Sequence, residues 1–125
     1  MENTNNDTEQ RLIKFSVDVI KASQKTENDL ASEHLIKQII RSATSPAFYY
    51  AVAENATSSV ESENNMKVCL KELRATLINL KIQKGIQTIS DTKELDRLIQ
   101  ENNELITIVD SEIKTAKNKN KNIGF

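Results

Sequence analysis

The chain has 125 residues, with 17 Lys and Arg against 18 Asp and Glu and a formal net charge of −1, and this length suits one domain. Its 2 Gly, 1 Pro, 1 Cys and 1 His disfavour a β-sandwich or barrel and exclude a glycine-rich phosphate loop, a disulfide framework and a Cys/His zinc cluster. We therefore expect an all-α protein.

The N-terminal part of the chain predicts a short disordered segment followed by a helix. Residues 1–7 are polar and rich in Asn, which is typical of disorder. From about Thr8 to Lys25, apolar residues recur at helical spacing, which predicts an amphipathic helix with one broad face toward the core. That face carries Leu12, Ile13, Phe15, Val19, Ile20 and Ala22.

The course of the second predicted helix depends on Pro46. Ser32 is the candidate N-cap, and the first half carries Leu35, Ile36, Ile39, Ile40 and Ala43. A proline inside a helix removes one backbone hydrogen bond. Either a kinked rod spans residues 32–59, or the helix stops near Thr44 and restarts at the proline. The stretch from Ala47 to Ala56 is apolar on nearly every side, which predicts the most buried helical segment.

The third predicted helix, from about Glu61 to Lys84, has two apolar faces. One is a heptad seam typical of helical bundles, made of Met66, Leu70, Leu73, Leu77 and Leu80. The other points roughly 120–200° away and consists of Val68, Ala75, Ile78 and Ile82. This second set is either part of a wide core with solvated aliphatic side chains or an interface with another subunit. We favour the interface.

The fourth predicted helix runs from about Thr92 to Lys117. Gly85 is the candidate residue that ends the preceding helix, and Asp91 with Glu94 forms a weak capping pattern for this one. Its apolar stripe consists of Leu95, Leu98, Ile99, Leu105, Ile106, Val109, Ile113 and Ala116. Asn102 lies within the stripe, where a polar residue often fixes the register of a bundle.

Four long helices with short connectors predict an up-down-up-down four-helix bundle over residues 8–117. A flexible basic tail is expected at residues 118–125. The polar, acidic N-terminus does not resemble a signal peptide, and no apolar run approaches the roughly 18 residues of a membrane helix. We therefore expect a soluble, cytoplasmic protein with no membrane partner.

Side chains that commonly serve in catalysis are sparse. His34 has Ala31 three positions before it, so it does not complete the Glu-x-x-His pair of a carboxylate-bridged metal bundle, and we interpret it as a surface residue. Cys69 lies at the margin of the heptad seam and is expected to be a buried free thiol. We predict no catalytic residue, no cofactor, no metal and no small-molecule substrate, and hence no enzyme.

Basic side chains form a candidate nucleic-acid surface. Lys67, Arg74 and Lys81 are spaced by seven residues and lie on one strip of the third helix. The full set of candidate contacts is Lys67, Lys71, Arg74, Lys81, Lys114, Lys117, Lys119 and Lys121. A ring of identical subunits would repeat each of these charges and strengthen a weak patch. The alternative is a solvated charged strip, which agrees with the nearly neutral net charge.

Several short motifs keep the spacing of a known family. RSATS at 41–45 is followed by Ala53, Ala56, Ser58, LKE at 70–72, Thr76 and Leu80, and later by NEL at 103–105, Ile108 and IKTAK at 113–117. In this order and spacing, the chain resembles the four helix bundle protein family, also called the 23S rRNA-intervening-sequence proteins. The resemblance covers roughly residues 10–120.

The resemblance implies a helical bundle that assembles as a homopentamer around a central channel. Most members of the family have no assigned activity, and some are encoded within insertions in ribosomal RNA genes. The related accessory variability proteins of diversity-generating retroelements are pentamers that bind reverse transcriptase and nucleic acid. The family's second helix is continuous, which favours a kink at Pro46 over a break. The chain departs from the family at Tyr49, which stands where Asn is usual.

Two functions are compatible with these features. The first is a non-enzymatic, homo-oligomeric scaffold or accessory protein, most simply a pentamer, that contacts RNA, DNA or a nucleic-acid enzyme. The second is a protein-binding adaptor or regulator with no nucleic-acid role.

Overall fold

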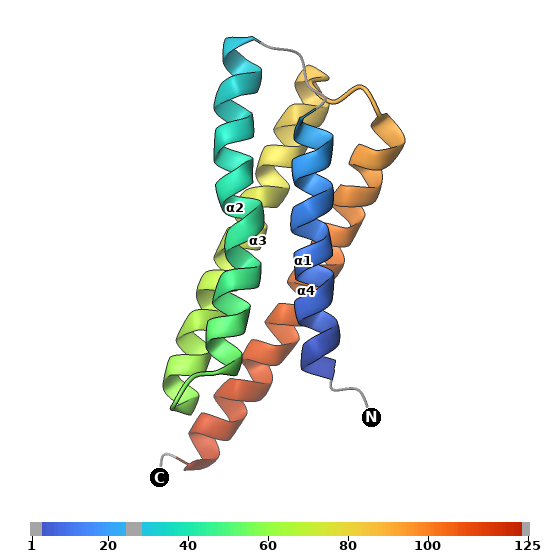
Figure 1. Cartoon of the computed structure of the whole chain (residues 1–125). Coiled ribbons are helices and arrows are strands. Elements are labelled where there is room, and N and C mark those ends of the chain that lie inside the picture. The colour runs from blue at the N-terminus through green and yellow to red at the C-terminus, as the bar shows by residue number, and fades with distance from the viewer. Residues whose placement is uncertain (1–3, 25–28, 124–125) are drawn as a thin grey trace.

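The computed structural model describes residues 4–24 and 29–123, and that part of the chain consists of four helices and their short connections. The helices are α1 (Thr4–Ser23), α2 (Leu30–Glu54), α3 (Ser59–Ile86) and α4 (Thr92–Ile123). Each runs antiparallel to its neighbours in the chain (Figure 1). α1 and α3 each contact both α2 and α4. The predicted up-down-up-down four-helix bundle is therefore confirmed.

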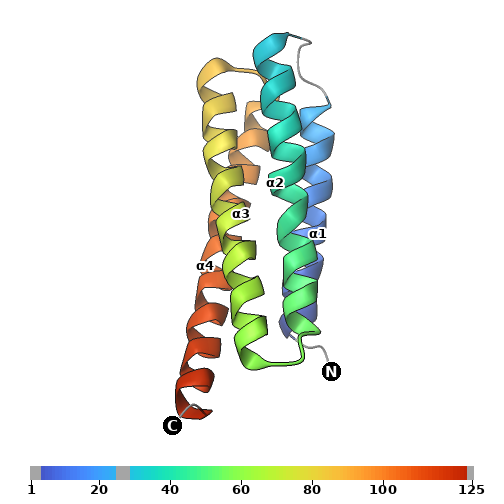
Figure 2. The ribbon, with the colours of Figure 1, turned by 90° about the vertical axis from the view of Figure 1, so that its left-hand side faces the viewer.

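The helices extend beyond the predicted bounds at both ends of the chain. α1 begins at Thr4 rather than Thr8, and α4 continues past Lys117 to Ile123. The end of α4 projects beyond the other helices (Figure 2). The disorder predicted for residues 1–3 and the flexibility predicted for residues 124–125 lie outside the described residues.

The α2 helix is one continuous helix of 25 residues that contains Pro46, and Figure 2 shows its ribbon uninterrupted. A break near Thr44 is therefore wrong. Pro46 is buried, so its ring contributes to the packing that holds the helix together despite the missing backbone hydrogen bond. Three residues before the proline, the Ser16 hydroxyl of α1 donates to the carbonyl of Ala43, at 2.7 Å, and this contact ties the two helices together next to the proline.

Two of the predicted helix ends are wrong by one turn or less. The N-cap of α2 is Asp29, whose carboxylate accepts from the Ser32 amide at 2.8 Å, so Ser32 lies inside the first turn. α3 continues through Gly85, and Gln87 takes the left-handed position at its C-cap, with φ 60°. Glycine is favoured at that position but is not required. The Asp91 cap of α4 is confirmed, since its carboxylate accepts from the Glu94 amide at 3.1 Å.

The core lies along the axis of the bundle and contains most of the predicted apolar residues. The heptad seam of α3 is confirmed, with Met66, Leu70, Leu73 and Leu80 buried and Leu77 half-buried. From the other helices the core takes Leu12, Phe15, Val19, Ile39, Leu95, Leu98, Leu105 and Val109. The leucine and aromatic side chains give the fold its main stabilisation, because burial of apolar surface dominates folding.

The prediction that the second half of α2 is the most buried helical segment is wrong. Tyr50 and Ala53 are buried, but Phe48 is 70% exposed and Val52 is 49% exposed. A helix in a four-helix bundle packs against two neighbours only, so one side of an all-apolar segment must face outward. Ile13, assigned to the buried face of α1, is likewise 42% exposed.

Candidate functional site

A row of polar side chains connects α2 to α3. The guanidinium of Arg41 lies 3.3 Å from a carboxylate oxygen of Glu72. Farther along, the side-chain amide of Asn79 donates to the carbonyl of Leu35 at 3.0 Å and accepts from Gln83 at 2.7 Å. Glu72, Asn79 and Gln83 are buried, and apolar spacing alone does not predict these polar residues for the core.

The second apolar set of α3 lies outside this row and is open to solvent. Ile78 is 56% exposed and Ile82 is 46% exposed, Ala75 is exposed, and Val68 is half-buried. A hollow of about 280 Å³ lies between α2 and three of these residues, Ala75, Ile78 and Ile82. We call it the α2/α3 hollow, and its walls include Gln38, Arg41, Ser42, Ala75, Ile78 and Ile82.

A second exposed apolar surface, which helical periodicity does not predict, lies where α2 meets α1. It is a groove of about 330 Å³ between α1 and α2. We call it the α1/α2 groove, and it is lined by Glu9, Ile13, Val17, Ile20, Ala47, Phe48 and Ala51. The signal was present in the sequence, because α2 is apolar on more sides than a helix with two neighbours can bury.

Two of the predicted basic residues form ion pairs within their own helices. Lys67 pairs with Glu63 at 2.8 Å, and Lys114 pairs with Asp110 at 3.3 Å. Of the predicted basic residues that the structure describes, Lys71, Arg74, Lys81, Lys117 and Lys119 are exposed and are not among the ion pairs. The last two lie near the end of α4, opposite the end of the bundle where α3 terminates. The side chain of Lys121 lies outside the described part.

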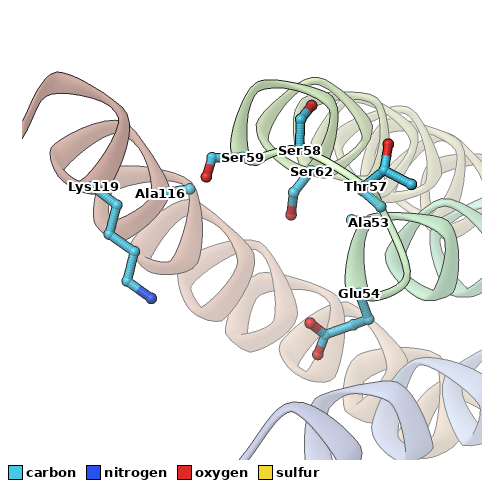
Figure 3. A pocket seen from close by; sticks show the side chains of 9 residues that line it. Ala53, Glu54, Thr57, Ser58, Ser59, Ser62, Ala116 and Lys119 are labelled. Atoms are coloured by element: carbon cyan, nitrogen blue, oxygen red, sulfur yellow. The ribbon is translucent and has the colours of Figure 1, made fainter. Parts of the chain in front are cut away.

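A polar hollow of about 370 Å³ lies where the α2–α3 connection meets the end of α4. Figure 3 shows Glu54 and Lys119 on opposite sides of it, with Ser59 and Ser62 between them. Burial raises the pKa of the Glu54 carboxyl, and the nearby charges of Glu112 and Glu9 raise it further. The hollow therefore brings together one carboxyl with a raised pKa, one lysine and several hydroxyls.

The residues that most often perform chemistry are placed as predicted. Cys69 is a buried free thiol, and burial, with a smaller contribution from the charge of Glu112, raises its pKa to about 12. His34 is exposed. Among the described residues, no group of three or more His, Cys, Asp or Glu side chains is arranged to hold a metal ion. In the same residues, no helix combines the length and apolarity needed to cross a membrane.

Comparison with known proteins identifies the fold. Neither a protein-family model nor a curated protein matches the sequence. A crystal structure from Bacteroides thetaiotaomicron VPI-5482, described as a protein with unknown function from the S23 ribosomal protein family, matches with a TM-score of 0.81 and 23% sequence identity. The match covers 90% of this chain and 99% of that chain. The two proteins share one fold, and the family named for that structure agrees in broad terms with the resemblance found in the sequence.

Proposed function

We propose that the chain is a non-enzymatic, homo-oligomeric scaffold or accessory protein that contacts RNA, DNA or a nucleic-acid enzyme. One observation carries the proposal, namely the exposed apolar face of α3, with Ile78 and Ile82 open to solvent. Contiguous exposed apolar side chains on a small protein mark an interaction surface. The resemblance to the 23S rRNA-intervening-sequence proteins favours a pentamer. The buried thiol of Cys69, with its raised pKa, supports a protein without nucleophilic chemistry.

The oligomer is tested by measuring absolute mass with light scattering after size exclusion. A pentamer has five times the chain mass of 14.1 kDa. With no Trp in the chain, concentration is best read from refractive index. The double variant Ile78→Glu/Ile82→Glu is expected to give smaller species, because two carboxylates in an apolar interface lose their hydration.

A matched control places two glutamates with the same spacing on the exposed outer side of α4, as Asn103→Glu/Thr107→Glu. This control is expected to keep the wild-type mass. An unchanged mass for Ile78→Glu/Ile82→Glu, or a wild-type mass equal to one chain, contradicts the proposed self-association.

Contact with nucleic acid rests on the exposed, unpaired cations of α3, namely Lys71, Arg74 and Lys81. Binding to phosphates must weaken as salt rises, because each contact releases counterions. The test is fluorescence anisotropy with a labelled single-stranded RNA and a DNA of the same sequence, across a salt series. The triple variant Lys71→Gln/Arg74→Gln/Lys81→Gln is expected to bind more weakly and with a smaller salt dependence.

The second candidate is a protein-binding adaptor with no nucleic-acid role. The ion pairs of Lys67 with Glu63 and of Lys114 with Asp110 favour it, because they neutralise part of the predicted basic surface. Absence of binding to either nucleic acid at low salt supports the adaptor and excludes direct nucleic-acid contact.

A further inference from the structure

A mostly apolar groove and a hollow of mixed polarity flank α2. The α1/α2 groove is bordered by Phe48, whose ring is 70% exposed and stands out from the helix. The α2/α3 hollow is a concave site with Ala75, Ile78 and Ile82 in its wall. We propose that Phe48 and the α1/α2 groove of one copy pack against the α2/α3 hollow of a second copy. This inference rests on the proposed self-association and specifies which surfaces meet.

The side chains of the two surfaces are chemically complementary. An exposed aromatic ring gains most when it enters a pocket of aliphatic side chains, which Ile78 and Ile82 supply. Arg41 also lines the hollow, where a guanidinium is able to lie over the face of an inserted ring. The hollow, at about 280 Å³, leaves room for one large side chain of the second copy.

The charges at the two surfaces favour unlike over like pairing. Of the described residues that line the α1/α2 groove, Glu9 alone is charged. Of those that line the α2/α3 hollow, Arg41 alone is charged, and its side chain remains 68% exposed although it pairs with Glu72 beside the hollow. Groove against groove brings two carboxylates together, and hollow against hollow brings two guanidiniums together. Groove against hollow brings opposite charges together, which lowers the energy of the contact.

The position of the two surfaces allows one copy to use both at once. They lie on either side of the outward stripe of α2 that carries Arg41 and Phe48, one shared with α1 and the other with α3. Each chain therefore carries both halves of the proposed contact. A contact between two different surfaces repeats from copy to copy and closes into a ring where the rotation permits, so it is compatible with a pentamer.

The test is complementation between two variants that each lack one surface. Phe48→Glu removes the projecting ring, and Ile78→Glu/Ile82→Glu places two carboxylates in the wall of the α2/α3 hollow. Each variant alone is expected to have the mass of one chain, 14.1 kDa. A one-to-one mixture is expected to form a complex of twice that mass, because each variant retains the surface that the other lacks. Circular dichroism verifies that both variants remain folded.

The outcomes separate this inference from the proposed function. A wild-type mass of one chain overturns both. A wild-type oligomer with an unchanged mass for Phe48→Glu, or a mixture of variants that stays at one chain, overturns the groove-to-hollow contact and leaves self-association standing. A Phe48→Glu chain that remains dimeric indicates hollow-to-hollow pairing and also overturns it.

Disulfide trapping tests the same contact without disrupting it. A Phe48→Cys chain and an affinity-tagged Ile78→Cys chain are co-expressed, purified together and oxidised. The inference expects a cross-link between the two different chains, since Cys69 is buried and does not compete. A cross-link formed by the Phe48→Cys chain with itself, or no cross-link at all in a folded oligomer, overturns the proposed contact.

Discussion

The hydroxyl of Thr76 in α3 lies 3.0 Å from the hydroxyl of Ser42 in α2, and both residues are buried. Ser42 belongs to the RSATS motif, and Thr76 follows the LKE motif of α3 at fixed spacing. Arg41 and Glu72 of the same two segments form an ion pair beside them. Motifs that are far apart in the sequence are therefore adjacent in the bundle, where they hold α2 and α3 in register.

Replacing Thr76 with valine is expected to destabilise the protein by about 1–3 kcal/mol, because a buried hydroxyl on Ser42 loses its partner while the shape of the core is kept. The measurement is the free energy of unfolding in urea, followed by circular dichroism at a fixed protein concentration. The control is Thr107→Val on the exposed side of α4, which is expected to change stability little. Equal stability of both variants contradicts a structural role for the Ser42–Thr76 contact.

Asp29 and Ser32 give expectations of different size for the start of α2. Asp29→Ala removes the acceptor for the Ser32 amide and is expected to lower stability. The Ser32 hydroxyl is only a second donor to the same carboxylate, whose pKa the backbone amide of Ser32 lowers most, so Ser32→Ala keeps the main capping bond and is expected to cost less. Thermal unfolding of the two variants distinguishes them. A larger loss for Ser32→Ala identifies Ser32 as the cap after all.

The sequence predicts the bundle well where the apolar spacing has a single phase. In α3, successive leucines are three or four residues apart, and only one face fits that repeat; they are Leu70, Leu73, Leu77 and Leu80. The outward face of α3 is predictable for the same reason, because Ile78 and Ile82 have the opposite phase. Both predictions rest on local periodicity, which does not depend on the position of the other helices.

Helical periodicity does not predict which side chains are buried where apolar residues occur on every side of a helix, or where the buried residues are polar. In the second half of α2, apolar residues occur on all sides, so the choice of Tyr50 rather than Phe48 for the core depends on where α1 and α3 pack. Asn79 and Gln83 have polar side chains, yet both are buried because their amides are hydrogen-bonded. Asn79 donates to a carbonyl of α2 and accepts from Gln83 of its own helix. The α1/α2 groove follows from the same packing and is therefore absent from a prediction based on single helices.

Asn102 of α4 allows a sharp test of a polar residue in the core. In the amide orientation that satisfies both of its ends, its nitrogen donates to the carbonyl of Leu73 and its oxygen accepts from the amide of Leu77, each at 3.0 Å. Asn102→Asp is expected to cost about 3–5 kcal/mol, because a fully buried carboxylate would have no compensating charge.

Asn102→Leu is expected to cost less than about 1.5 kcal/mol, because the size is similar and the carbonyl of Leu73 and the amide of Leu77 are partners in the helix itself. Chemical denaturation of the two variants measures the difference. Losses of equal size would mean that the hydrogen bonds of Asn102, rather than its neutrality, stabilise the core. A changed oligomer mass for Asn102→Leu would indicate that the residue fixes the register of the bundle.

The raised pKa of Glu54, at the end of α2, allows a prediction of how the stability of the protein changes with pH. Its pKa is raised by burial, and then by the charges of Glu112 and Glu9, against a smaller opposing hydrogen bond from Tyr50. Glu112 itself accepts from the hydroxyl of Tyr50 at 2.7 Å. The folded protein therefore holds a proton on Glu54 more tightly than the unfolded chain does.

Such a group contributes stability that is present below its unfolded pKa and is lost as the pH rises through its folded pKa. Since the ordinary value is 4.5, Glu54→Gln is expected to be more stable than wild type at neutral pH, with the difference shrinking toward pH values of about 4. Urea denaturation at a series of pH values, with the protein concentration fixed, measures this difference. The exposed Glu33→Gln, at the other end of α2, controls for the loss of one negative charge. A difference that is constant across the series, or that grows as the pH falls, contradicts the raised pKa of Glu54.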